Sequence, residues 1–149
     1  MAALRLDLLA KLVLAVVLGG LVGLEREWRG KPAGLKTNTL ICMAAVLFTD
    51  MSQRAARGGG DPGRIAAQVL TGVGFLGAGT ILHEKGGVIG LTSAATIWMV
   101  TAIGMTVGWG AYIDAVGATA LVLVVLAGLE RAEVWIRARR PHPPEVHPE

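Results

Sequence analysis

Five long apolar runs fill most of this chain and constrain its fold more than any other feature of the sequence. An α-helix needs about 20 apolar residues to cross the roughly 30 Å of hydrocarbon in a bilayer. The runs come close to that length and cover Leu6–Leu24, Leu35–Met51, Ile65–Leu82, Leu91–Val107 and Ala111–Leu129. Charged residues make up only 17% of the chain, against about a quarter in soluble domains. We therefore predict an all-α fold, a polytopic helical membrane bundle of about five transmembrane helices, over residues 1–129.

Residues 130–149 differ in character from the five runs. The part up to Arg140 has the pattern of a short amphipathic helix, and a basic, proline-rich tail follows it. Basic residues near span ends favour the cytoplasmic side of a membrane. They are more numerous after the first, third and fifth runs than at the N-terminus or after the second and fourth. We therefore expect the N-terminus outside and the C-terminus in the cytoplasm.

Glycines inside the runs need a reason, because each costs about 1 kcal/mol relative to alanine in a helix exposed to water. In lipid, small residues let helix backbones approach one another closely. The glycines that we assign to helix packing are Gly19, Gly23, Gly72, Gly74, Gly77, Gly79, Gly104 and Gly108. They fall in the first, third and fourth runs, so we expect those three helices at the centre of the bundle.

The third run also contains a pattern that resembles a nucleotide-binding fingerprint. Gly72, Gly74 and Gly77 match the spacing G-x-G-x-x-G. That fingerprint requires a preceding strand and an acidic residue about 20 positions later. The residues at that distance, Thr96 to Met99, include no acid. We therefore interpret the segment as a packed membrane helix.

A first charge cluster lies on the predicted cytoplasmic side. Its members are Glu25 to Arg29 after the first run, Lys36, Thr37 and Asn38 at the start of the second, and His83, Glu84 and Lys85 after the third. Grouped carboxylates with water are ligands that Mg²⁺ accepts, so Glu25, Glu27 and Glu84 are the candidate metal residues. Such clusters are more often solvated ion pairs at a membrane surface. The sequence leaves both interpretations open.

A second charge cluster lies on the predicted outer side and contains Asp50, Asp61, Arg64 and Asp114. Asp50 follows an apolar stretch, so its carboxylate needs a partner near the hydrocarbon, and we expect Arg64 to be that partner. Arg64 and Gln68 are four residues apart and share one helix face. Asp61 is typical of a helix start. The alternative role for these residues is helix capping and an interfacial salt bridge.

Several classes of function find no support in the sequence. The single cysteine, Cys42, can form neither a disulfide nor a cysteine metal site within one chain. There is no Walker motif, and no nucleophile stands at a recognisable spacing from a base. We therefore expect no enzyme activity and no cofactor other than Mg²⁺. The basic residues are not interleaved with aromatic residues, which argues against a nucleic-acid partner.

Short motifs stand in a fixed order along the chain. They read GGLVGLERE at 19–27, PAGLKT at 32–37, DPGRIAAQV at 61–69, GFLGAG at 74–79 and GLTSAATIW at 90–98. This set resembles the membrane domain of the MgtC/SapB family and covers nearly the whole chain up to about Leu129. The resemblance marks as motif residues Glu25, Arg26, Glu27, Lys36, Thr37, Asp61, Arg64 and Gln68. We add Asp50 because of its place beside the apolar layer.

The resemblance implies a multi-pass inner-membrane protein of bacteria, linked to growth at low Mg²⁺ and, in some members, to virulence through survival inside host cells. It also implies regulation of other membrane machines, including inhibition of the proton-driven ATP synthase. Many members carry a soluble cytoplasmic domain where this chain has only its basic tail. We therefore expect the membrane part to do the work.

Two functional interpretations compete. In the first, the chain is a membrane regulator whose small-residue faces bind a second copy, as a homodimer, or another membrane protein. In the second, it is a divalent-cation (Mg²⁺) transporter, and the acids on its two sides form entry and exit sites. No acid lies near the middle of any run, which favours the first interpretation. The acids on both sides keep the second open.

Overall fold

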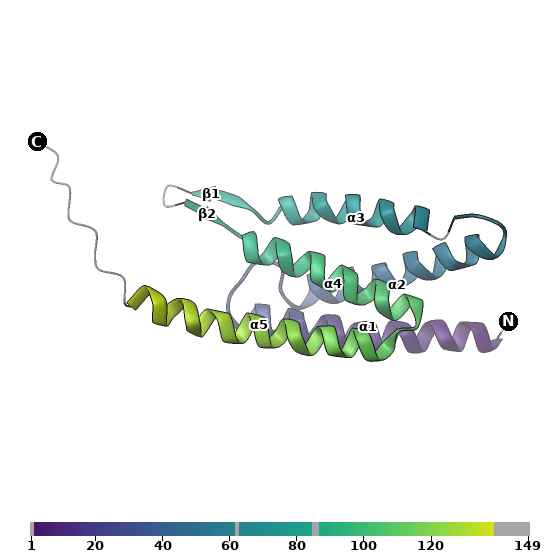
Figure 1. The fold of residues 1–149 in the computed structure, drawn as a ribbon, viewed down its shortest axis with the longest axis horizontal. Coiled ribbons are helices and arrows are strands. Elements are labelled where there is room, and N and C mark those ends of the chain that lie inside the picture. Colours follow the sequence, from purple (N-terminus) through teal and green to yellow (C-terminus); the bar gives the residue numbers. More distant parts are fainter. Residues whose placement is uncertain (1, 62, 85–86, 139–149) are drawn as a thin grey trace, which may run out of the picture.

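A computed structural model describes residues 2–61, 63–84 and 87–138 of the chain. Within those ranges the elements are α1 (Ala2–Trp28), α2 (Leu35–Arg57), α3 (Gly63–Ala78), β1 (Leu82–Glu84), β2 (Gly87–Ile89), α4 (Leu91–Trp109) and α5 (Tyr112–Ala138). The helices lie side by side along the long axis of the molecule, and α1 begins at the end opposite to that at which α5 ends (Figure 1). The chain runs back and forth between two ends of one bundle.

Among the described residues, three helical stretches are long and apolar enough to cross a membrane. They are Leu6–Trp28 in α1, Leu91–Trp109 in α4 and Tyr112–Leu129 in α5. The other two helices differ, because α2 carries charged residues near both ends and α3 has only 16 residues. Both pack against the apolar helices. The prediction of an all-α helical membrane bundle is confirmed.

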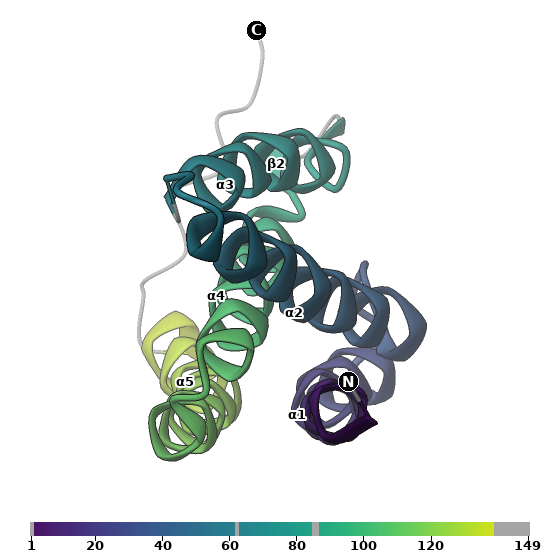
Figure 2. The same ribbon diagram turned by 90° about the vertical axis from the view of Figure 1, so that its right-hand side faces the viewer.

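Helix α2 lies at the centre of the bundle, with α1 on one side and α4 on the other (Figure 2). The core between these three helices contains Val22 of α1, Val46 of α2 and Ile103 of α4, all fully buried. The expectation that the third run lies at the centre is wrong. Helix α3 is short and buries only Val73 and Gly77, so it lies on the outside of α2 and α4.

Glycines of α1 and α4 meet α2 from its two sides. A methyl group added at Gly19 would lie 2.6 Å from the Cβ of Cys42, and one at Gly104 would collide with the carbonyl oxygen of the same residue. One turn further along each helix, methyl groups at Gly23 and Gly108 would lie 2.7 Å from the Cα of Leu35 and 2.6 Å from the Cβ of Thr49. Only glycine permits such close approach of the backbones. We call this arrangement the glycine seam.

The glycines of α3 have different surroundings. A methyl group added at Gly72 or Gly74 would meet no atom within 4 Å, and one at Gly77 would make ordinary contact with Ala94 at 3.7 Å. Gly79 lies just beyond the helix and faces only its own last turn. Gly72 and Gly74 therefore do not pack against another helix of this chain.

The segment between α3 and α4 is a hairpin that the sequence analysis missed. The third apolar run reaches Leu82, but α3 ends at Ala78. Strands β1 and β2 then pair antiparallel, with Leu82 opposite Ile89. Gly87 and Gly90 have φ values of 134° and 90°, which side chains disfavour. These glycines let the chain reverse and enter α4.

The last helix is longer than predicted. A short turn at Gly110, with φ of 86°, joins α4 to α5, as expected for a helical hairpin. Helix α5 then runs without interruption to Ala138, so residues 130–138 continue it and form no separate helix. The predicted tail at 139–149 lies outside the described residues.

Candidate functional site

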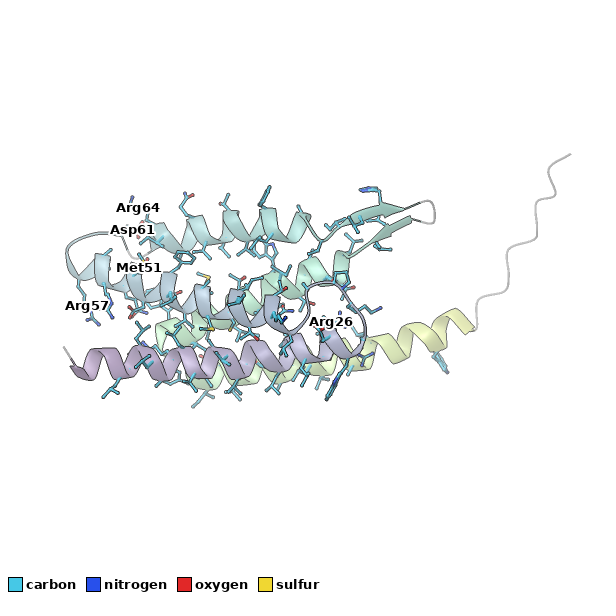
Figure 3. The ribbon with its side chains drawn as sticks, turned by 180° about the vertical axis from the view of Figure 1, so that it is seen from behind. Arg26, Met51, Arg57, Asp61 and Arg64 are labelled. Atoms are coloured by element: carbon cyan, nitrogen blue, oxygen red, sulfur yellow. The ribbon has the colours of Figure 1, made fainter. Side chains whose placement is uncertain are left out.

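Charged side chains gather at the two ends of the bundle. We call the end where α1 finishes and α4 begins the Glu25 end, and the end where α2 finishes and α3 begins the Asp50 end. Figure 3 shows Arg26 at the first, and Arg57, Asp61 and Arg64 at the second. The structure thus keeps the two predicted clusters apart, at opposite ends of the helices.

At the Glu25 end, one carboxylate holds two arginines. The Oε2 atom of Glu25 accepts a hydrogen bond of 2.7 Å from Nε of Arg26, and its Oε1 atom accepts one of 3.2 Å from Nη2. Nε of Arg29 lies 2.5 Å from the same Oε1 atom. Arg26 is only 2% exposed. Both oxygens of Glu25 are therefore engaged by cations, and the net charge of this trio is positive.

Glu27 has a different role at the same end, because it caps α2. Its Oε2 atom accepts a hydrogen bond of 3.0 Å from the backbone N–H of Leu35, and a methyl group at Gly34 would collide with the carboxylate. A negative charge at a helix N-terminus is stabilising. Lys36 and Thr37 follow in the first turn of α2 and are exposed. The motif therefore joins the end of α1 to the start of α2.

Asn38 completes this junction, although the sequence analysis named it only as a member of the cluster and not as a motif residue. It is fully buried, and its Nδ2 atom donates to the carbonyl oxygens of Ala33 and Gly34. Ala33 has a φ of 57°, an uncommon conformation for a residue with a side chain. The Oδ1 atom of Asn38 is buried and has no hydrogen-bond partner among the described residues. This side chain holds the tight loop between α1 and α2.

At the Asp50 end, the expected pair of Asp50 and Arg64 is not formed. The Oδ2 atom of Asp50 lies 2.6 Å from Nε of Arg54. Arg54 is one turn further along the same helix, where residues four apart face each other, whereas Arg64 lies beyond a loop and is exposed. The prediction of Arg64 as the partner is wrong.

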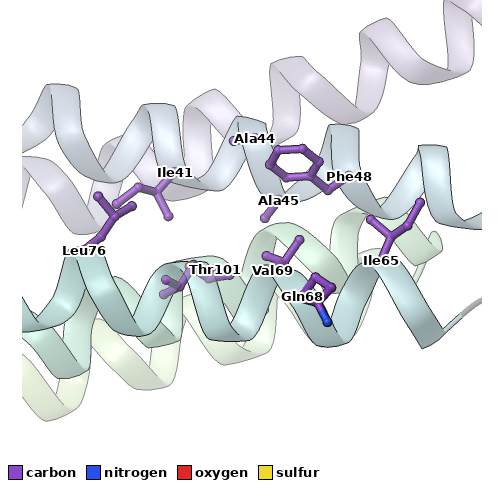
Figure 4. Close-up of a pocket in the computed structure, with 11 residues that line it drawn as sticks. Ile41, Ala44, Ala45, Phe48, Ile65, Gln68, Val69, Leu76 and Thr101 are labelled. Carbon is purple, nitrogen blue, oxygen red and sulfur yellow. The ribbon is translucent and has the colours of Figure 1, made fainter.

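Asp61 and Gln68 lie along α3. The Oδ1 atom of Asp61 accepts a hydrogen bond of 2.8 Å from the backbone N–H of Gly63, so Asp61 caps the start of α3 as expected. Gln68 lines an apolar cavity of about 400 Å³ between α2 and α3, which Thr101 of α4 also lines (Figure 4). Gln68 therefore lies at the cavity between α3 and the core of the bundle.

A buried lysine forms the polar contact that sequence reasoning missed. Lys11 of α1 is 8% exposed, and its Nζ atom donates to the carbonyl oxygen of Gly108 at 3.2 Å. Asp7, one turn earlier, lies 3.1 Å from the same Nζ atom. Nε2 of Gln53 donates to the Gly108 oxygen at 2.9 Å. The available signal was a lysine inside an apolar run, which needs an acceptor.

The candidate metal residues are not assembled into a metal centre in the described part of the chain. Glu25 and Glu27 make separate contacts, one with arginines and one with a helix N-terminus. The side chain of Glu84 lies outside the described residues. The described residues contain no group of three or more His, Cys, Asp or Glu side chains that could hold a metal. The described carboxylates act as anchors between and within helices.

Comparison with known proteins identifies relatives over most of the chain. A protein named "Putative magnesium transporter YhiD" from Escherichia coli (strain K12) is 44% identical over 127 residues, which are 80% of this chain and 59% of that protein. Protein MgtC of Salmonella typhimurium (strain LT2) is 45% identical over 112 residues, 75% of this chain and 48% of that protein. An uncharacterized protein of Haemophilus influenzae is 42% identical over 144 residues, 91% of this chain and 60% of that protein.

The chain therefore spans about half to three fifths of the length of these relatives. No solved structure matches the chain. The family model described as the MgtC family matches residues 12–135, a range that begins inside α1, ends inside α5, and includes both charged ends and the glycine seam. This membrane-embedded chain belongs to the MgtC family.

Proposed function

We propose that the chain is a regulator of Mg²⁺ homeostasis in the bacterial inner membrane, where it supports adaptation to low Mg²⁺ by binding another membrane protein. The names of two relatives, MgtC and a magnesium transporter, support the link to Mg²⁺. The proposed action is binding and not catalysis. The family resemblance suggests the proton-driven ATP synthase as one partner, and a second copy of the chain as another.

One observation carries the choice of a regulator: three acids at the bundle ends, Glu25, Glu27 and Asp50, are already engaged. Glu25 is held by two arginines, and Asp50 by Arg54. Glu27 caps α2. A carrier must bind and release its ion repeatedly, so its acidic ligands need to be available to the ion. Here each of these carboxylates stabilises the fold, which suits a protein with a fixed shape that a partner recognises.

The surface that supports partner binding is the outer side of α3. Phe75 is 82% exposed, and a methyl group added at Gly74 would meet no atom within 4 Å. A membrane helix can approach closely where small residues leave the backbone uncovered. The excess of basic residues at the Glu25 end supports a cytoplasmic position for that end, and we propose that the N-terminus lies outside.

The alternative function is a divalent-cation transporter, which the name of the YhiD relative favours. The two functions differ in one measurable property, the movement of Mg²⁺ across a sealed membrane. A regulator restores growth at low Mg²⁺ without conducting the ion, whereas a transporter does both.

The first test measures Mg²⁺ uptake by liposomes that contain the purified chain and a Mg²⁺-sensitive dye. The second measures growth at low Mg²⁺ of bacteria that lack the gene for this protein and receive it on a plasmid. We expect rescue of growth and no saturable Mg²⁺ uptake. Glu25→Gln is the diagnostic variant, and Lys36→Gln is its control, because Lys36 is an exposed motif residue at the same end. Saturable uptake that Glu25→Gln abolishes and Lys36→Gln retains would replace the regulator with the transporter.

A further inference from the structure

Helices α4 and α5 are joined at Gly110 and separate towards the Glu25 end (Figure 1). A cavity of about 380 Å³ lies between them. One wall is a face of α4 that includes Thr96 and Met99, and the other is a face of α5 that includes Val122 and Leu126. Residues three or four apart share one helix face, so each wall is a single stripe of its helix. The cavity is therefore a groove that runs along the helix pair.

The groove opens at the outer surface of these two helices. Thr96 and Val122 form its buried floor, whereas Met99 and Leu121 at its edges are exposed. Helix α4 contributes small side chains to the groove, such as that of Ala95, and these leave space that the side chains of α5 do not fill. Both helices contain stretches long and apolar enough to cross a membrane. Their outer surface therefore faces the hydrocarbon of the bilayer.

The lining of the groove selects an apolar ligand. Its described lining residues include no charged side chain, and the hydroxyl of Thr96 donates a hydrogen bond of 2.8 Å to the backbone oxygen of Thr92. An apolar cavity of about 150 Å³ holds one benzene molecule, so this groove has room for roughly 15 carbon atoms. A hydrocarbon chain of that size fits the groove, whereas a polar molecule would lose its hydrogen bonds there.

The groove continues into a second cavity, of about 620 Å³, at the Glu25 end. Thr92, Val125 and Leu126 line both cavities. Together the two follow Leu91–Met99 of α4 and 118–129 of α5. At 1.5 Å per residue these stretches are about 12 and 16 Å long, which is close to one leaflet of a hydrocarbon layer about 30 Å thick. The open path therefore begins at the charged end of the bundle and stops about halfway along α4.

We propose that one acyl chain of a membrane phospholipid occupies the groove between α4 and α5, with its headgroup at the Glu25 end. A helix of a second copy or of another protein would cross both leaflets, whereas the groove follows only one. The acyl chain contacts both helices where they separate, and so supports the direction in which α5 leaves the bundle. The site does not depend on whether the protein regulates or transports.

The experiment measures lipid retained by the purified full chain in detergent, by native mass spectrometry. The probes are palmitoyloleoylphosphatidylcholine and dioctanoylphosphatidylcholine, which share a headgroup and differ in chain length. We expect the chain to retain the long-chain lipid and not the short-chain one. Ala95→Leu should weaken that retention about fivefold, because the larger side chain takes space from the acyl chain. Leu121→Ala removes one edge of the groove without adding bulk, and should weaken it about threefold.

Ala120→Leu is the matched control, because Ala120 is an exposed alanine of α5 that does not line the groove. It should retain the long-chain lipid as the natural chain does, and all variants should melt alike without lipid. Equal retention of the two lipids, or equal losses in Ala95→Leu and Ala120→Leu, would overturn the proposal. A dimer that Ala95→Leu dissociates while lipid retention stays unchanged would assign the groove to a second copy instead.

Discussion

The glycine seam and helix α3 use the same residue type in opposite ways. Gly19 and Gly104 press on Cys42 from two sides, and even a methyl group has no room at either position. Gly72 and Gly74 face open space in this chain. Both pairs lie in apolar helices with small-residue spacing, so glycine content alone does not tell which helix lies in the core. The difference teaches that the seam glycines hold the helices of the bundle together, whereas Gly72 and Gly74 contact no other helix of this chain.

The largest effect is expected from Gly104→Ala. The added methyl would collide with the carbonyl oxygen of Cys42 and lie 2.7 Å from the Cβ of Ala45. Overpacking of this kind costs about 3 kcal/mol when backbone must move. Gly117→Ala in α5 is the control, because nothing lies within 4 Å of its new methyl. Equilibrium unfolding in detergent measures both; equal stabilities of the two variants would mean that the seam is loose.

The second largest effect on stability is expected from the hydrogen bonds that Lys11 and Gln53 donate to the Gly108 oxygen, beside the glycine seam. Lys11→Met should lower the free energy of unfolding by about 2 kcal/mol, because the Gly108 oxygen loses one of its two side-chain donors in a buried place. Asp7→Asn should cost less than about 1 kcal/mol, since Asp7 is half exposed. The same unfolding assay compares them, and a larger cost for Asp7→Asn would contradict the assignment of Gly108 as the main partner.

Substitution of an α3 glycine by alanine should change the free energy of unfolding in the opposite direction to Gly104→Ala. Gly72→Ala should leave the stability of the monomer unchanged or raise it by up to about 1 kcal/mol, because alanine favours the helix and meets no neighbour. If a partner helix docks there, the same methyl should weaken association. Thermal unfolding gives the first quantity, and energy transfer between labelled chains in liposomes gives the second. A loss of monomer stability near that of Gly104→Ala would erase the contrast between the two regions.

The smallest effect tests the ion pair at the end of α2. Asp50→Ala and Arg54→Ala should each cost about 0.5 kcal/mol, and the double variant should cost no more than either, because the two side chains pair with each other. Asp50→Ala and Arg64→Ala should instead add independently. Double-mutant cycles in the unfolding assay separate these results, and coupling of Asp50 to Arg64 would restore the pairing expected from sequence.

Hydrophobic length and spacing were enough to predict the helices, because a bilayer leaves few ways to satisfy the backbone. The position of α3 was not predictable in this way. Its glycines resemble those of the seam in sequence, and only the tertiary contacts reveal that they lie open. The hairpin of β1 and β2 was missed because the apolar run continues through Leu82, past the end of α3.

The sequence was enough to select the charged residues of the two clusters, but it did not predict which residues they contact. Local geometry decided those: Asp50 pairs with Arg54 on its own helix, and Glu27 reaches the backbone of Leu35 across a loop. Lys11 was not selected from the sequence, because its acceptor at Gly108 is 97 residues away in the chain. Contacts of such long range depend on the packing order of the helices.

The uninterrupted course of α5 has a mechanical consequence. Its 27 residues make a rod of about 40 Å at 1.5 Å per residue, whereas the hydrocarbon layer is about 30 Å thick. The surplus of about 10 Å extends beyond the hydrocarbon layer as a rigid part of the helix, which fixes the distance of Ala138 from the layer and the direction in which it points. Removing one residue between 130 and 137 would rotate the end of the helix by about 100°. A partner that binds this end should therefore respond to the direction in which it points as well as to its distance from the membrane.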